Sequence, residues 1–66
     1  MTGSDILRVL RGYGCEVVRR RGSHVRVSCD GCQTTVPVHA GQDVPSGTLR
    51  AIERDLEPCL GRRWLR

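Results

Sequence analysis

The fold is decided by residues 15–38, whose sequence is CEVVRRRGSHVRVSCDGCQTTVPV. This stretch lacks a helical period, is rich in valine and threonine, and is divided into three short runs by Arg21-Gly22 and by Asp30-Gly31. Dipeptides of this kind occur in the tight turns of hairpins. The stretch therefore predicts three antiparallel strands.

The second turn sets a register for the last two strands. If Asp30-Gly31 is a two-residue turn, Cys29 faces Cys32 and His24 faces Pro37. Side chains then alternate between an apolar face, which packs on a core, and a polar face, which stays open. The apolar face holds Val25, Val27, Cys29, Cys32, Thr34, Val36 and Val38, and the polar face holds His24, Arg26, Ser28, Thr35, Pro37 and His39.

The register of the first strand depends on the length of the first loop. A three-residue loop over 20–22, with Gly22 in the left-handed conformation, places Cys15 and Val17 on the apolar face. A two-residue loop would turn both side chains to the other face. We expect the three-residue loop.

Two helices flank the strands. Thr2 and Asp5 have the spacing of a capping box, and Gly12 and Gly14 provide a stop, which predicts a helix over about 3–12. The apolar residues of this helix share one face, and so do those of a later segment, over about 47–57. These are Ile6, Leu7 and Leu10, and then Leu49, Ile52 and Leu56.

The later segment predicts a second helix over about 47–57. Ser46 is the expected N-cap, and Pro58 and Gly61 are expected to end the helix. A short basic tail, residues 58–66, follows. Its Trp64 either stacks on a base or packs over an apolar groove, and we expect packing.

The predicted order is α-β-β-β-α in one domain spanning residues 1–66. Two amphipathic helices and one apolar sheet face have a simple solution, an α+β fold with both helices on the same face of a three-stranded antiparallel sheet. The opposite face is left open, and it carries both histidines, His24 and His39.

Length and composition limit the function classes. A chain of 66 residues builds one small core, which excludes a two-domain enzyme with a deep cleft. No apolar run is long enough for a membrane span, and Asp5 and Arg8 interrupt the N-terminal segment where a signal peptide would be apolar. We expect a cytoplasmic protein with no membrane association.

The cationic residues are all arginine. The formal net charge is +4, with eleven arginines and no lysine. The planar guanidinium suits phosphate and nucleic acid. A genome that favours arginine codons would give the same composition, so composition alone leaves both explanations open.

The four cysteines are expected to be reduced, because no export signal precedes them. Cys29 and Cys32 have the spacing of a zinc knuckle, but Cys15 and Cys59 do not form a second pair at that spacing. We expect small apolar side chains, no metal and no cofactor. An oxidised preparation could contain a Cys29–Cys32 bridge. A small zinc protein remains the alternative.

His24 is the candidate catalytic residue. RNA cleavage without a metal needs a base for the 2′-hydroxyl, an acid for the leaving 5′-oxygen, and positive charge on the phosphate. An imidazole serves either proton role near neutral pH. The residues beside His24 provide the charge and a backbone that approaches phosphate closely: Arg19, Arg20, Arg21, Gly22, Ser23 and Arg26.

His39 is a candidate proton partner. The predicted register makes it a diagonal neighbour of His24 on the open face, with Cβ atoms roughly 7–8 Å apart. The alternative is that His24 is an ordinary exposed strand histidine. The run 19–21 would then be a solvated hairpin tip.

The order of several short motifs adds a resemblance. Gly22-Ser23-His24, then residues 35–39 (TVPVH), Pro45 and residues 47–52 (GTLRAI), together with the opening helix and Gly14, resemble the HicA family of bacterial toxins. The resemblance covers nearly all of residues 4–56. It implies a fold like the double-stranded RNA-binding domain.

The resemblance also implies a function. HicA proteins are the toxins of type II toxin–antitoxin systems, endoribonucleases that cleave mRNA, inhibit translation and act in stress responses. The histidine of the Gly-Ser-His motif is their catalytic residue, which corresponds to His24. A HicB-type antitoxin protein is the implied partner and masks that site.

Three features depart from the family pattern. Cys15 stands where an aromatic residue is frequent, Val25 stands where a second histidine is common, and the tail 62–66 is outside the pattern. The role of His39 is therefore inferred from its predicted position and is not implied by the resemblance. The alternative to a nuclease is a module of the same fold that binds RNA without cleaving it.

Overall fold

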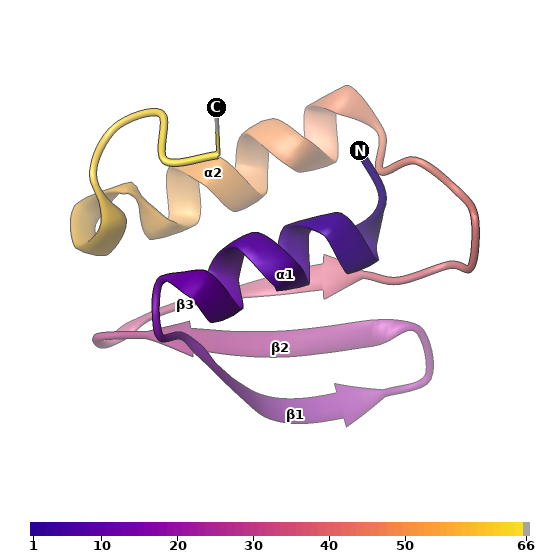
Figure 1. The fold of residues 1–66 in the computed structure, drawn as a ribbon, viewed down its shortest axis with the longest axis horizontal. Helices are drawn as coiled ribbons and strands as arrows, with labels where there is room; N and C mark the ends of the chain where they lie inside the picture. Colours follow the sequence, from indigo (N-terminus) through magenta and orange to yellow (C-terminus); the bar gives the residue numbers. More distant parts are fainter. Residues whose placement is uncertain (66) are drawn as a thin grey trace.

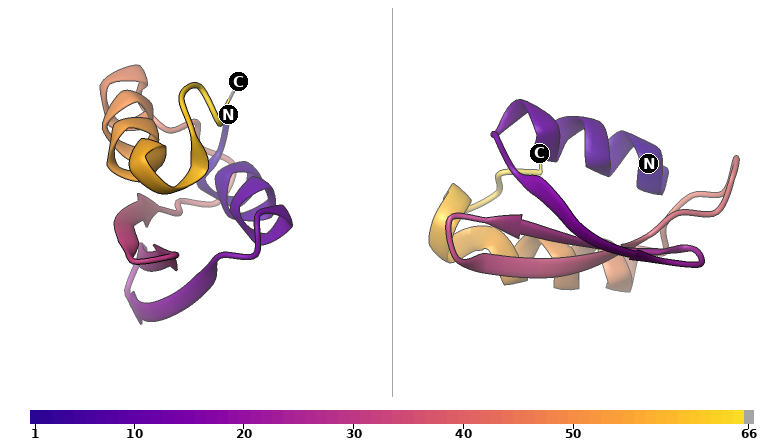
Figure 2. Two further views of the ribbon diagram at one scale, coloured as in Figure 1. Left: turned by 90° about the vertical axis from the view of Figure 1, so that its left-hand side faces the viewer. Right: turned by 90° about the horizontal axis from the view of Figure 1, so that it is seen from below.

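The structure is a computed structural model that describes residues 1–65. Its elements are α1 (Gly3–Gly12), β1 (Glu16–Arg21), β2 (His24–Cys29), β3 (Cys32–Pro37) and α2 (Ser46–Leu60). The strands form one antiparallel sheet in the order β1-β2-β3, and both helices lie on the same side of it (Figure 1; left view of Figure 2). The predicted α+β fold is confirmed.

Helix α1 has the predicted bounds and the predicted capping box. The backbone N–H of Asp5 donates to Thr2 Oγ1 at 3.1 Å, and the backbone N–H of Thr2 donates to Asp5 Oδ2 at 2.9 Å. Gly3 lies against the end of β3, where a Cβ atom would collide with the carbonyl oxygen of Pro37. Glycine at this position lets the helix approach the strand closely.

Strands β2 and β3 have the predicted register. His24 pairs with Pro37, Val25 with Val36, and Cys29 with Cys32 across the Asp30-Gly31 turn. The predicted apolar face is buried under the helices. The core consists of Ile6, Leu10, Val25, Val27, Cys29, Val36, Val44, Ile52, Leu56 and Trp64.

The predicted loop between β1 and β2 is wrong. Gly22 and Ser23 form a two-residue turn, and Arg21 pairs directly with His24. A bulge between Val17 and Arg19 then shifts the register, so Val17 pairs with Val27 on the core side. Every residue of β1 is nonetheless exposed, because this strand lies at the sheet edge.

Helix α2 differs from the prediction at both ends. Pro45 is the N-cap and makes no side-chain capping bond, while Ser46 is the first helical residue. The helix continues through Pro58 to Leu60, and Gly61 follows with a φ of 94°. A late proline removes only one hydrogen bond of the last turn, and that turn is anchored by a disulfide described below.

Trp64 packs on the core, as expected, and is 5% exposed. Its indole Nε1–H donates to the carbonyl oxygen of Glu53 at 2.7 Å, and its ring meets the Tyr13 ring edge-on at 6.2 Å. Residues 58–60 of the predicted tail belong to α2. Arg66 lies outside the described residues.

One buried polar side chain is satisfied across the two layers. The hydroxyl of Thr34, which is 1% exposed, donates to Asp55 Oδ2 at 2.9 Å.

Neither helix within residues 1–65 has the length and apolar character needed to cross a bilayer.

Candidate functional site

A shallow hollow of about 290 Å³ lies on the sheet face that the helices leave open. Its lining consists of Arg19, Arg21, His24, Arg26 and Thr35. The strand pairing explains this grouping, because Arg21 lies opposite His24, and Arg26 lies between Arg19 and Thr35 on the two neighbouring strands. Alternation turns all five side chains to one face.

The turn before His24 depends on glycine. Gly22 has a φ of 57°, the left-handed conformation that side chains with a Cβ rarely adopt. A Cβ atom there would have open space around it, so the requirement is conformational and not steric. The carbonyl oxygen of Ser23 accepts a hydrogen bond from Val38 N–H at 2.7 Å, which ties the turn to the chain after β3.

The hollow is strongly cationic. Three guanidinium groups and one imidazole line it, and no carboxylate does. Arg26 is fixed by two hydrogen bonds: Nε donates to Gln33 Oε1 at 3.1 Å, and Nη1 donates to Thr35 Oγ1 at 3.0 Å. This arrangement is suited to binding an anion with several oxygens, such as a phosphate.

The structure brings together only part of the predicted arginine run. Arg20 pairs with Val25, whose side chain is in the core, so Arg20 lies on the opposite side of β1 from the hollow. Gly22 and Ser23 form the adjoining turn without lining the hollow.

His39 does not line the same hollow as His24. Strand β3 ends at Pro37, and His39 lines a separate hollow of about 290 Å³ together with Gln42 and Thr48. The two imidazoles are thus on the walls of different hollows.

Thr35 and Gln33 were missed as site residues. The predicted register already placed Thr35 on the open face opposite Arg26. Its hydroxyl lies on the strand next to Arg26, directly opposite that exposed arginine, and this pairing is the signal that could have identified it. Gln33 is one diagonal step away, because it pairs with Ser28.

The four cysteines are not reduced, contrary to the expectation from the sequence. They are not free thiols, because Cys15 is bonded to Cys29 and Cys32 to Cys59. The Cys29–Cys32 bridge considered for an oxidised preparation is not the pairing in the structure. In this structure all four sulfurs are bonded in disulfides, so none is a thiolate that could bind zinc.

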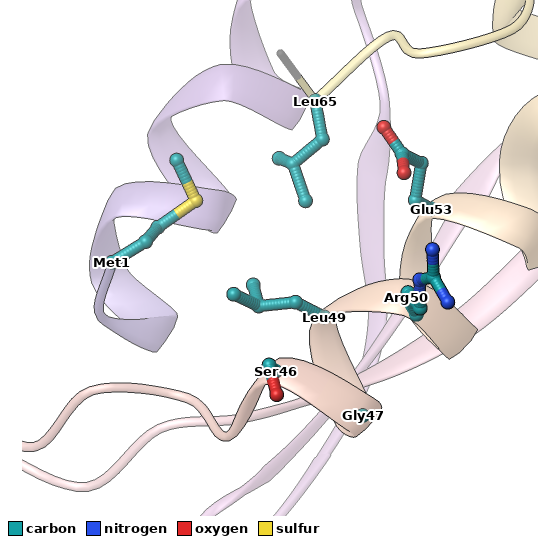
Figure 3. Close-up of a pocket in the computed structure, with 7 residues that line it drawn as sticks. All are labelled: Met1, Ser46, Gly47, Leu49, Arg50, Glu53 and Leu65. Carbon is teal, nitrogen blue, oxygen red and sulfur yellow. The ribbon is translucent and has the colours of Figure 1, made fainter.

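A larger hollow of about 640 Å³ lies in the helical layer (Figure 3). The side chains of Met1, Leu49 and Leu65 point into its centre, and Arg50 and Glu53 lie at one side. It contains no histidine, and apolar groups fill its middle. Its chemistry gives no reason to assign it to phosphate or proton transfer.

An open sheet face whose basic hollow includes an imidazole defines a small α+β protein suited to phosphodiesters. Residues 3–57 match the family described as HicA toxin of bacterial toxin–antitoxin. The chain belongs to the HicA toxin family.

A curated relative is similar over most of both chains. It is the "Probable mRNA interferase HicA" of Pseudomonas fluorescens (strain Pf0-1), 32% identical over 56 residues, which cover 85% of this chain and 93% of the relative. No solved structure gives a significant match.

Proposed function

We propose that the protein is the toxin of a type II toxin–antitoxin pair, a metal-independent endoribonuclease that cleaves mRNA and so inhibits translation in the cytoplasm. The observation that carries this proposal is the grouping of His24 with Arg19, Arg21 and Arg26 in one open hollow. The HicA family and the name of the relative, an mRNA interferase, support it. Residues 1–66 act as a single domain.

In the proposed reaction the ribose attacks its own phosphodiester. His24 takes the proton of the 2′-hydroxyl, O2′ forms a bond to phosphorus, and the bond from phosphorus to O5′ breaks. The leaving oxygen takes a proton, which gives a 2′,3′-cyclic phosphate and a free 5′-hydroxyl. His39 is our candidate for the acid.

The cationic and turn residues bind the substrate. Arg19, Arg21 and Arg26 give the hollow the positive charge that binds the phosphates of the RNA, and positive charge beside the reacting phosphate stabilises the transition state. Gly22 and Ser23 shape the rim of the site with their backbone. Arg20, on the other side of β1, contacts the RNA backbone beyond the hollow.

The proposed protein partner is a HicB-type antitoxin. The hollow is open and shallow, and His24 and the three arginines are all exposed, so a protein that covers this face would neutralise the toxin. The membership of a toxin–antitoxin family supports a partner of this kind.

The test is cleavage of a defined RNA by purified protein in the presence of a chelator. The parent should produce fragments that end in 2′,3′-cyclic phosphate, and His24→Ala should reduce the rate by at least about 100-fold, the usual contribution of a proton-transfer residue. Because His24 is exposed, the variant should keep the unfolding temperature of the parent. Equal cleavage rates for the two proteins would refute the mechanism.

One observation favours a second function, an RNA-binding module that does not cleave. The hollow contains one imidazole, whereas the proposed reaction needs a base and an acid. Such a module would leave RNA intact while its affinity fell steeply with salt. Contacts from three arginines predict a slope of about −2 to −3 for log K against log salt concentration.

A further inference from the structure

The three arginines of the hollow differ in how firmly they are held. Arg26 donates to Gln33 through Nε at 3.1 Å and to Thr35 through Nη1 at 3.0 Å. Within residues 1–65, neither Arg19 nor Arg21 makes a side-chain hydrogen bond or ion pair. Only Arg26 therefore has a guanidinium plane fixed before any ligand arrives.

The fixed guanidinium retains free donors. A guanidinium has five N–H bonds, and the two contacts use one on Nε and one on Nη1. Nη2 makes no hydrogen bond to any residue in the described range, 1–65. The three remaining donors, two on Nη2 and one on Nη1, are available to phosphate oxygens, and we call them the fork.

The fork lies beside the candidate catalytic residue. Arg26 is two residues after His24 on β2, so their side chains share one face and their Cα atoms are about 6.8 Å apart. Both line the same hollow. A phosphate in contact with the imidazole is therefore within reach of the fork.

We propose that Gln33 and Thr35 are positioning residues that hold Arg26 as the clamp of the reacting phosphate, while Arg19 and Arg21 provide general affinity for the RNA backbone. The proposal rests on the proposed function and deepens it. Donors that are oriented in advance act on charge as it develops, because they need no reorganisation during the reaction. Mobile arginines lose side-chain freedom on binding and contribute mainly to affinity.

The two roles predict different kinetic effects. Thr35→Val keeps the shape of the side chain and removes the acceptor, and Gln33→Leu removes the other acceptor. Each should lower kcat about tenfold, with KM changed by less than about twofold, as expected for an interaction that acts in the transition state. Thr35→Ser, which restores a hydroxyl, should recover most of the lost rate.

Arg19→Gln is the matched comparison within the hollow. It should raise KM and lower the salt slope by about one, with a much smaller effect on kcat. The proposal is overturned if Thr35→Val raises KM while kcat is unchanged. It is also overturned if Thr35→Ser is as slow as Thr35→Val.

A measurement that does not depend on cleavage separates this proposal from the proposed function. In ¹⁵N spectra the Nε–H of Arg26 should be ordered in the parent and mobile in Gln33→Leu, and inorganic phosphate should shift it at lower concentration than the Nε–H of Arg19 or Arg21. If RNA stays intact but these signals behave as stated, the result supports the clamp and refutes the proposed nuclease activity. An Nε–H that is mobile in the parent overturns the clamp whatever the cleavage result.

Discussion

The Asp5 carboxylate closes the capping box of α1. The backbone N–H of Thr2 donates to it, and this hydrogen bond is the main reason why the pKa of Asp5 lies below its usual range. The Thr2 hydroxyl and the nearby positive charges of Arg8 and the N-terminus lower the pKa further. The charged form of Asp5 is thus the form that stabilises the fold.

This depressed pKa predicts a pH dependence for Asp5→Asn. The contribution of Asp5 is fully present above the pKa of the unfolded chain, about 3.9, and is lost as the pH falls through the lower pKa of the folded protein. The variant should be less stable than the parent at pH 6, and the difference should shrink towards pH 3. Denaturant midpoints measured across this range are the test, and a difference that stays constant with pH contradicts the prediction.

Among the helices and strands, the sequence predicts the geometry wherever a single local signal sets it. The Asp30-Gly31 turn fixes the β2–β3 register, and alternation from that turn placed His24, Arg26 and Thr35 on the open face. The capping box likewise gave the bounds of α1. Both signals involve residues only a few positions apart, so no tertiary information was needed.

Strand β1 and the cysteines lacked such a signal. The bulge after Val17 compensates for the shorter loop, and alternation cannot reveal a bulge in an edge strand that is exposed on both faces. The split of Arg19 and Arg21 from Arg20 follows from this register. The disulfide pairing depends on which segments lie next to the β2–β3 turn in the folded chain, and that is a property of the tertiary structure.

At the scale of the whole molecule, the two disulfides connect distant segments to one hairpin. Cys15–Cys29 joins the residue before β1 to the end of β2, and Cys32–Cys59 joins the start of β3 to the last turn of α2. Cys29 and Cys32 face each other, so both links converge at one end of the sheet. Such links matter most in a chain whose core is too small to provide much stability alone.

Reduction should therefore destabilise the protein strongly. Closed loops with sequence separations of 14 and 27 residues correspond to roughly 3 kcal/mol per disulfide in the chain-entropy description. Loss of either should lower Tm by at least about 10 °C in a domain of this size. Thermal unfolding with and without a dithiol reductant, and of the double variant Cys32→Ala/Cys59→Ala, checks this.

Peptide mapping of unreduced protein is the control for the disulfide prediction. It should recover Cys15 linked to Cys29 and Cys32 linked to Cys59. An unchanged Tm after complete reduction, or a Cys29–Cys32 link, contradicts the arrangement. The proposed site of action, the cytoplasm, is a reducing compartment, so the stability of the reduced form bears directly on the protein at work.

In our proposal, His24 makes this family member a toxin by cleaving RNA. The most direct measurement compares growth and intact mRNA after induced expression of the parent and of His24→Ala, with equal amounts of folded variant confirmed. Growth arrest and mRNA loss with the parent alone is the predicted result. Equal arrest with both proteins would show that toxicity comes from binding, and would contradict the account.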